Sequence, residues 1–253
     1  MSDEFFKIKH NYFDVHGSDE VTATLFPNDL DMQDQILNMF FNMKQYECPD
    51  IISHFLDTAV IMEHFEFDSY INRKNKGGSD YRVLLHREST RIEELAKNTL
   101  KNKDHAIIHG SIHSSASLQN YKKNFIRVFN KHYKNIDSYY ENSTEHTNQF
   151  KNVEMWFFIE DVTPLGNFYT AETKEKGLIL LYPYHVQEIV ELLSKSQKIH
   201  GIIFGSLNRM TIFYKPSQTI LSVYHELNAI IDENNFFHYD PKIIHWSQKI
   251  KKT

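Results

Sequence analysis

Residues that favour tight turns are scarce in this chain, which has 8 Gly and 6 Pro among its 253 residues. A β-sandwich or another loop-rich fold needs many such turns, whereas helices and a few long strands do not. Hydrophobic residues make up 41% of the chain, and a chain of this size can bury a sizeable core. The sequence therefore predicts a folded protein of helices joined to long strands.

The spacing of apolar residues gives the order of these elements. We expect a strand at 19–27, a helix at 28–46, two strands within 48–67, a helix at 79–101, an extended segment at 105–113 and a helix at 115–140. We then expect a strand from 153 to 161, a helix at 183–197, a hairpin of two strands within 199–216 and a helix at 218–233. This order predicts an α/β (α+β) fold with one central mixed β-sheet flanked by helices. We expect a single α/β domain over residues 1–253, with a polar internal linker near 142–152.

The cysteine content and the lengths of the apolar runs indicate where in the cell the protein is expected. Cys48 is the only cysteine, so an intramolecular disulfide and a multi-cysteine zinc site are excluded. The N-terminal sequence MSDEFFKIKHNYFDVHG is too charged for a secretory signal, and no run approaches the about 20 apolar residues that span a membrane. We expect a cytoplasmic protein that has no membrane contact.

The net charge of −5 argues against a chain that is basic throughout, as dedicated nucleic-acid binders commonly are. Contacts with DNA or RNA must then come from local patches. One such patch lies in the helix expected at 115–140 and comprises Lys122, Lys123, Arg127, Lys131 and Lys134. The apolar residues between them keep helical spacing, so we expect an exposed basic face. This face could bind phosphates, or it could be an ordinary solvated helix surface.

Acidic residues flank the two strands expected within residues 47–68, ECPDIISHFLDTAVIMEHFEFD. A divalent cation that activates water for phosphodiester cleavage needs two or three converging carboxylates, and Mg²⁺ prefers oxygen ligands. Asp50 begins the first strand and Glu63 lies along the second, so a hairpin can bring both to one pocket. Glu47 could add a third ligand.

This arrangement resembles the PD-(D/E)XK nuclease superfamily. The resemblance covers residues 28–100, with a helix, a strand that begins at Pro49-Asp50, a strand that carries Glu63, and a second helix. It implies a restriction-endonuclease-like core, Mg²⁺ or Mn²⁺ as the cofactor, and DNA or RNA as the substrate. Asp50 and Glu63 would then be catalytic metal ligands.

The chain departs from the superfamily at the lysine that helps to position the attacking water. That lysine stands two residues after the second acid, where this chain has Phe65. A lysine of the polar loop at 72–80, Lys74 or Lys76, could reach the site instead, and we assign this catalytic role to Lys76.

Side-chain alternation sorts the second strand into two faces. Glu63 shares one face with two phenylalanines, and the opposite face carries His64, Glu66 and Asp68. An unpaired charge on an apolar face costs several kcal/mol, so Glu63 needs a partner. A metal, a proton or a basic residue such as Arg82 or Arg87 could serve. Glu66 could replace a ligand on this strand, but it faces away from Glu63.

Two other groups of residues could bind a metal. Glu160 and Asp161 end an apolar strand, where ligands often converge in α/β proteins, although a turn before Pro164 is the plainer interpretation. Three histidines recur at steps of four, and on a helix they could ligate zinc. Gly110 and the β-branched residues between them favour an extended segment instead; the histidines are His105, His109 and His113.

Other catalytic motifs are absent from the sequence. It has no G-x-x-x-x-G-K-[ST], G-x-G-x-x-G or G-x-S-x-G, which argues against P-loop, Rossmann-type and α/β-hydrolase chemistry. Two hypotheses remain. The first is a metal-dependent nuclease, favoured by Asp50, Glu63 and the basic helices. The alternative is a non-catalytic cytoplasmic binding protein on a nuclease-like α/β fold, favoured by Phe65 and the negative net charge.

Overall fold

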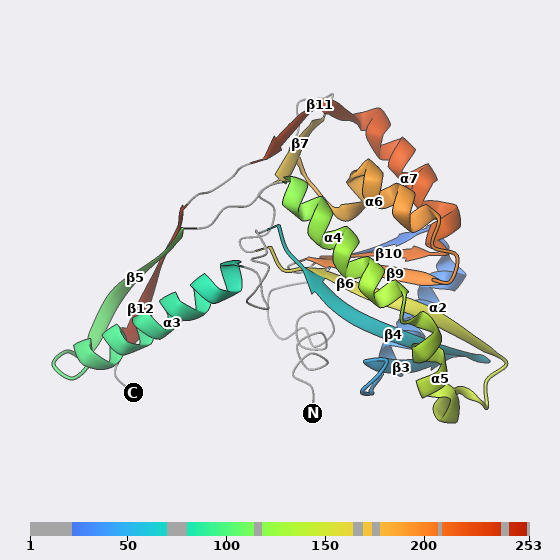
Figure 1. Ribbon diagram of the computed structural model, residues 1–253, viewed down its shortest axis with the longest axis horizontal. Coiled ribbons are helices and arrows are strands. Elements are labelled where there is room, and N and C mark those ends of the chain that lie inside the picture. The colour runs from blue at the N-terminus through green and yellow to red at the C-terminus, as the bar shows by residue number, and fades with distance from the viewer. Residues whose placement is uncertain are drawn as a thin grey trace.

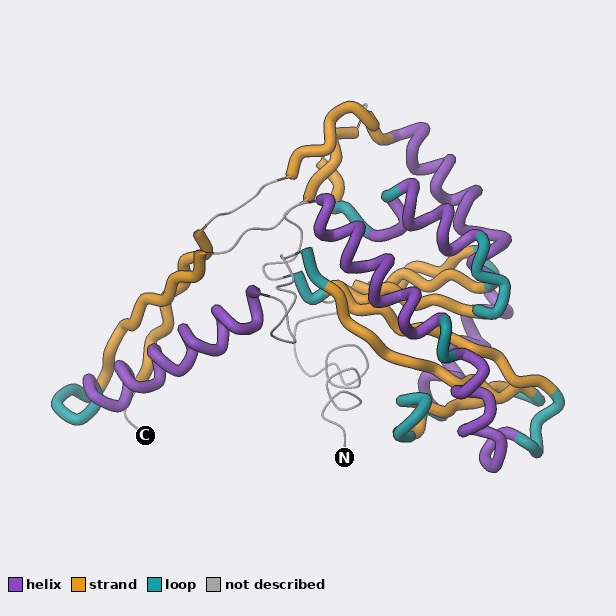
Figure 2. Tube along the Cα trace, in the orientation of Figure 1, coloured by secondary structure: helices purple, strands orange, loops and turns teal. Residues whose placement is uncertain are grey.

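A seven-stranded mixed sheet forms the centre of the protein (Figures 1 and 2). The computed structural model describes residues 22–69, 80–113, 118–163, 169–173, 178–206, 209–238 and 243–251. The strand order is β1-β10-β9-β6-β4-β3-β2. The strands are β1 (Thr22–Phe26), β2 (Lys44–Gln45), β3 (Ile51–Phe55), β4 (Thr58–Phe67), β6 (Asn152–Asp161), β9 (Gly201–Ser206) and β10 (Arg209–Tyr214).

The strand directions place the carboxyl ends of three central strands at the same end of the sheet. β4, β6 and β9 run parallel to one another, whereas β3 is antiparallel to β4 and β10 is antiparallel to β9. The carboxyl ends of the three parallel strands therefore meet, which is where α/β sheets commonly bind ligands. The predicted α/β class and its central mixed sheet flanked by helices are confirmed.

Helices cover both faces of the sheet. α2 (Leu30–Phe41) lies on one face, where its Ile36 and Met39 are buried with Trp156 and Phe158. This helix begins at Asp29, whose carboxylate accepts hydrogen bonds from two backbone N–H groups of the first turn. The other face is covered by α4 (Leu118–Tyr133), α5 (Ile136–Thr147), α6 (Gln187–Ser194) and α7 (Pro216–Ile230).

The segment predicted as a polar linker near 142–152 is helical as far as Thr147, and residues 148–151 connect this helix to the next strand. The segment predicted as one helix at 115–140 is divided into α4 and α5, and α5 continues through Thr147 before β6 begins at Asn152. α5 is polar because it buries only a narrow stripe, which includes Ile136, Tyr139 and Ser143. Such a helix has too few apolar residues to show clear periodicity in the sequence.

A separate arm is built from α3 (Asp80–Thr99), β5 (His105–His113) and β12 (Ile243–Lys251), and it extends away from the central sheet in Figures 1 and 2. β5 and β12 form an antiparallel ribbon, and α3 packs on it through Ile92 and Ile108. The extended segment at 105–113 is confirmed, but β12 was not predicted. A second small sheet contains β7 (Tyr169–Thr173), β8 (Leu178–Leu180) and β11 (Ile231–His238), which were also not predicted.

An ion pair within α3 is hydrogen-bonded to the backbone of β5. Glu88 accepts a hydrogen bond from the Arg91 guanidinium at 2.6 Å and another from the Ser111 backbone N–H at 2.9 Å. Arg91 also donates to the backbone carbonyl of His109 at 3.0 Å. The hydrogen bond from Arg91, and then that from Ser111, lowers the pKa of Glu88 from 4.5 to about 2.

We expect the arm to be weakened by acid. Because the folded-state pKa of Glu88 lies below its ordinary value, its stabilising contribution is present above about pH 4.5 and is lost as the pH falls toward about 2. Glu88→Gln should therefore lower the melting temperature near neutral pH and reduce its fall in acid. Solvent screening keeps the effect below about 1 kcal/mol. Identical pH profiles of the two proteins in thermal melts would contradict this assignment.

Candidate functional site

Glu63 lies on the face of β4 that carries α4 and α5, and its carboxylate is held by both helices. Its Oε1 atom accepts a hydrogen bond from the Tyr139 hydroxyl at 3.0 Å and lies 3.0 Å from His132 Nδ1. Because a carboxylate only accepts hydrogen bonds, His132 must donate through Nδ1. The side chain predicted as a metal ligand is therefore a buried hydrogen-bond acceptor. Its partners are His132 and Tyr139 instead of the arginines considered from the sequence.

Phe65, in the position of the expected lysine, is part of the same packing. Its ring stacks on His132, with the ring centroids 4.6 Å apart and an angle of 10° between the planes. Phe65 is 5% exposed, so this position contributes to the core. Lys76, which we expected to take the role of the lysine, lies outside the described residues.

Asp50 and Glu47 do not join Glu63 in a three-ligand site. The Asp50 carboxylate accepts a hydrogen bond from the His64 backbone N–H at 2.8 Å. Glu47 is exposed and lines a surface cavity with Cys48 and Asn142. Asp50, Glu63 and Glu47 are absent from the groups of three or more potential ligands that converge within the described part of the chain.

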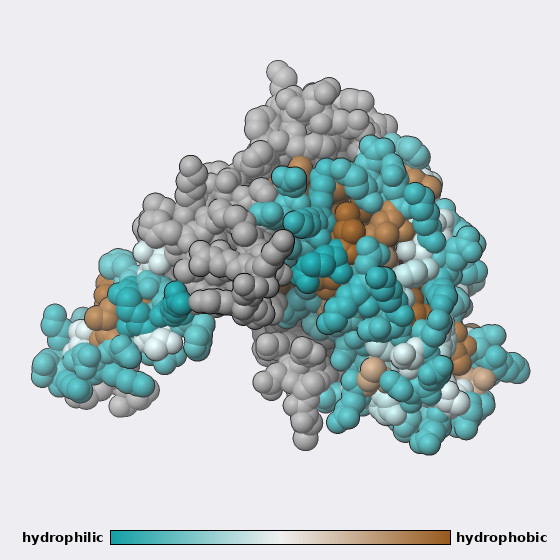
Figure 3. All heavy atoms as spheres, viewed as in Figure 1, coloured by the Kyte–Doolittle hydropathy of each residue, from teal (hydrophilic) through white to brown (hydrophobic). Residues whose placement is uncertain are grey.

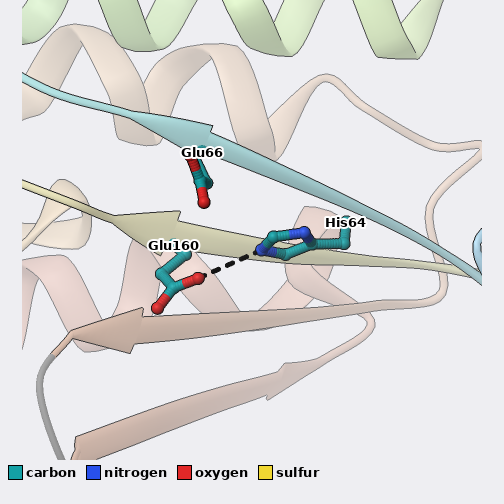
Figure 4. A group of neighbouring side chains, drawn as sticks. All are labelled: His64, Glu66 and Glu160. Carbon is teal, nitrogen blue, oxygen red and sulfur yellow. Dashed lines mark hydrogen bonds and ion pairs between the residues drawn. The ribbon is translucent and has the colours of Figure 1, made fainter. Parts of the chain in front are cut away.

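A different group of side chains does converge, at the carboxyl ends of β4 and β6. Ligand atoms of His64, Glu66 and Glu160 all lie within 4.8 Å of one another. His64 and Glu66 come from β4 and Glu160 comes from β6, and Figure 4 shows the three side chains directed toward a common point. This is the group in the described residues that could hold a metal ion.

Strand register explains why these side chains meet. β4 and β6 are parallel, with His64 opposite Phe158 and Glu66 opposite Glu160. Residues two apart on a strand share a face, so all three potential ligands lie on one side of the sheet. In the next strand Gly205 stands opposite Glu160, and it adds no side chain beside the carboxylate.

The geometry of the group is suited to a cation. His64 Nε2 lies at hydrogen-bond distance, 3.2 Å, from Glu160 Oε2, and this distance is also close to the about 3 Å that separates adjacent ligands of an octahedral ion with bonds of 2.0–2.1 Å. The His64 ring is 6% exposed, whereas Glu66 and Glu160 are half-buried. One imidazole and two carboxylates fit Mn²⁺ or a related transition ion better than Mg²⁺, which prefers oxygen ligands throughout.

Further carboxylates lie at the same edge, on the opposite face of the sheet. Burial raises the pKa of Asp161 to about 6; a hydrogen bond from Thr163 opposes this rise, and the nearby charge of Asp68 adds to it. The Thr163 backbone N–H donates to Asp161 at 2.9 Å. The ends of β4 and β6 thus collect acidic groups on both faces, which favours cations at this edge.

The basic residues predicted on one helix are only partly a surface stripe. Lys123, Arg127 and Lys131 are exposed on α4, and Lys134 is exposed just after it. Lys122 is instead half-buried and donates a hydrogen bond to Glu188 on α6 at 2.6 Å. The exposed face is confirmed without Lys122, and its contact with nucleic acid stays a prediction.

Sequence reasoning recognised parts of the His64, Glu66 and Glu160 group but did not join them. Alternation placed His64 and Glu66 on one face, and Glu160 was recognised at the end of an apolar strand. The missing information was that β4 and β6 are neighbours in register, because α3, β5, α4 and α5 separate them in the sequence.

The chain was compared with known proteins in three ways. Its sequence matches no protein-family model and no curated protein, and its fold matches no solved structure. In the part of the chain that the structure describes, no helix combines the length and the apolar character needed to cross a lipid bilayer.

Proposed function

We propose that the protein is a divalent-metal-dependent phosphodiesterase that acts on nucleic acid, with the metal held by His64, Glu66 and Glu160. The observation that carries this proposal is the convergence of these three side chains within 4.8 Å at the carboxyl ends of two parallel strands. Mn²⁺ is the cofactor that the ligand set favours, and Mg²⁺ is the weaker candidate.

The proposed chemistry depends on the coordination positions of the metal that the three protein ligands leave free. A metal bound by one imidazole and two carboxylates keeps further coordination positions for water and substrate. Such an ion lowers the pKa of a bound water and polarises a phosphoryl oxygen. His64, Glu66 and Glu160 would hold the ion. Burial fixes His64, and its backbone N–H donates a hydrogen bond to the Asp50 carboxylate.

A nucleic-acid substrate is supported by exposed cations on α4. Lys123, Arg127 and Lys131 recur at steps of four and form a stripe, and such groups commonly bind phosphates. α4 covers the face of the sheet opposite His64, Glu66 and Glu160, so such contacts would hold a nucleic acid by its phosphates away from the metal group, without reading its sequence. The restriction-endonuclease-like core belongs to this proposal as well, with the metal ligands on the face of β4 opposite Glu63.

Metal binding is the first test of this function. Mn²⁺ should raise the melting temperature of the purified chain, since a ligand present at about 100 times its Kd stabilises a protein by about 2.7 kcal/mol. Mg²⁺ should give a smaller rise. Glu160→Gln should abolish the Mn²⁺ effect, because an uncharged amide is a much poorer ligand, while Glu145→Gln on the exposed surface of α5 should leave it unchanged.

Cleavage is measured on the same proteins with single- and double-stranded DNA and RNA. We expect Mn²⁺-dependent cleavage by the original chain and by Glu145→Gln, and none by Glu160→Gln. A full Mn²⁺ effect in folded Glu160→Gln would show that the ligand assignment is wrong.

A second candidate function is a non-catalytic binding protein on the same fold. The buried Phe65 in the lysine position favours it, because that position carries no group able to position water. A Mn²⁺ effect without cleavage of any of the four substrates would support this alternative.

A further inference from the structure

The ribbon of β5 and β12 has two different faces. Its register pairs His109 with Ser247, and Ile107 with Lys249. The even-numbered face carries Ile108, which is buried against α3. On the odd-numbered face, the exposed residues include His105, Ile107, His109, Ser247 and Lys249, and Ile107 is 63% exposed.

The charge of the ribbon differs from that of the chain. The whole chain has 33 acidic and 28 basic residues, yet neither β5 nor β12 contains an Asp or a Glu. The two strands carry four histidines and two lysines, and the register places all six at positions of the odd-numbered face: His105, His109, His113, His245, Lys249 and Lys251. By contrast, the exposed cations of α3 are mixed with Glu93 and Glu94.

The arm that carries this face projects from the body of the protein in Figures 1 and 2. The part of its surface seen in Figure 3 is largely hydrophilic. Each strand has 9 residues, and at about 3.4 Å per residue such a ribbon is about 30 Å long. A projecting two-stranded ribbon of this length, free of acidic residues, is complementary to a polyanion.

We propose that this ribbon binds double-stranded DNA by entering its major groove, with the odd-numbered face of β5 and β12 toward the bases and phosphates. The inference rests on the proposed function, which supplies nucleic acid as the substrate class, and names duplex DNA within that class. The major groove of B-form DNA, about 12 Å wide, admits a two-stranded β-ribbon. Lysine binds phosphates, and histidine and serine side chains can hydrogen-bond to base edges or phosphates.

The shape of the groove distinguishes DNA from RNA. The major groove of an A-form RNA duplex is deep and narrow, so protein side chains do not read it. A ribbon that binds through the major groove should therefore prefer duplex DNA. A surface that acts only through its charge should bind the two duplexes about equally.

The test is equilibrium binding of the full chain to fluorescent DNA and RNA duplexes of the same sequence, with EDTA present to prevent metal-dependent cleavage. We expect at least about tenfold tighter binding to DNA. Lys249→Glu combined with Ser247→Glu should weaken DNA binding at least about tenfold. Loss of the lysine contact should also reduce the slope of log affinity against log salt concentration by about 1.

Lys195→Glu, an exposed charge reversal in the body just after α6, is the matched control and should leave DNA affinity nearly unchanged. Circular dichroism checks that each variant folds. Equal affinity for the two duplexes, no binding to DNA, or a folded ribbon variant with unchanged affinity would overturn the inference.

Failure of this inference can be distinguished from failure of the proposed function. Glu145→Gln, on the exposed surface of α5 and outside the proposed metal site, should keep full DNA affinity in EDTA. If DNA binding depends on the ribbon but neither cleavage nor a Mn²⁺ effect is found, the enzyme proposal fails alone. If Mn²⁺-dependent cleavage is found but the folded ribbon variant binds DNA as tightly as the original chain, only the ribbon inference is wrong.

Discussion

Replacing Glu63 with alanine should lower the free energy of unfolding by on the order of 3 kcal/mol while leaving the Mn²⁺ effect intact. The Tyr139 hydroxyl and His132 Nδ1 both use Glu63 Oε1 as an acceptor. A buried donor that loses its acceptor costs about 1–3 kcal/mol. Tyr139 is 4% exposed, so water cannot readily replace the carboxylate.

The hydrogen bonds of Tyr139 and His132 explain why Glu63→Ala should destabilise the protein. Burial first, and then the adjacent Glu63 charge, raises the pKa of Tyr139 well above its ordinary value, so its hydroxyl remains a donor at neutral pH. His132 lies 3.1 Å from the same hydroxyl and can regain only one contact when the carboxylate is lost. Urea denaturation of the original chain and of Glu63→Ala measures the difference.

Tyr139→Phe is the matched control for the hydrogen bonds that Glu63 accepts from Tyr139 and His132. It removes one donor and leaves Glu63 paired with His132, so its cost should be about 1 kcal/mol. The Mn²⁺ effect on melting temperature separates this structural role from metal binding. Its loss in a folded Glu63→Ala protein would restore Glu63 as a ligand, as the resemblance to the nucleases implied.

The need of Glu63 for a partner could be predicted from the sequence, but the partner could not. Alternation on β4 correctly placed this carboxylate with Phe65 on an apolar face, and the cost of an unpaired charge there was clear. His132 and Tyr139 lie 69 and 76 residues further along the chain. Their approach depends on how α4 and α5 dock on the sheet, which local patterns do not contain.

The same limit explains why the metal group was found only in the structure. Local periodicity gave most of the sheet strands and the main helices, because each of those segments buries a regular stripe or an apolar run. Which strands become neighbours depends on crossover connections and packing. His64 and Glu160 are 96 residues apart, so their meeting follows from the parallel pairing of β4 and β6. The strands β7, β11 and β12 were missed because they lack a fully apolar run, and β8 was missed because its apolar run is only 3 residues long.

Gly201→Ala is the second substitution with a large expected effect, and it should destabilise the protein by about 3 kcal/mol. Gly201 on β9 stands opposite Trp156 on β6. A Cβ atom at this position would lie 2.2 to 2.4 Å from three atoms of the Trp156 ring, far inside van der Waals contact. The ring is 0% exposed and packed among neighbours of a dense core. The overlap with the Cβ atom can therefore be removed only if the strands or the indole move.

A double-mutant cycle tests whether this contact is the cause. Trp156→Phe removes the larger indole ring and should cost stability by itself, since it leaves a cavity. In the Trp156→Phe background, Gly201→Ala should cost much less than in the original chain, because the clashing atoms are gone. The coupling should be about 1–2 kcal/mol, within the range found for residues in contact. Additive effects in urea denaturation would show that the alanine acts through the backbone of β9 and not through Trp156.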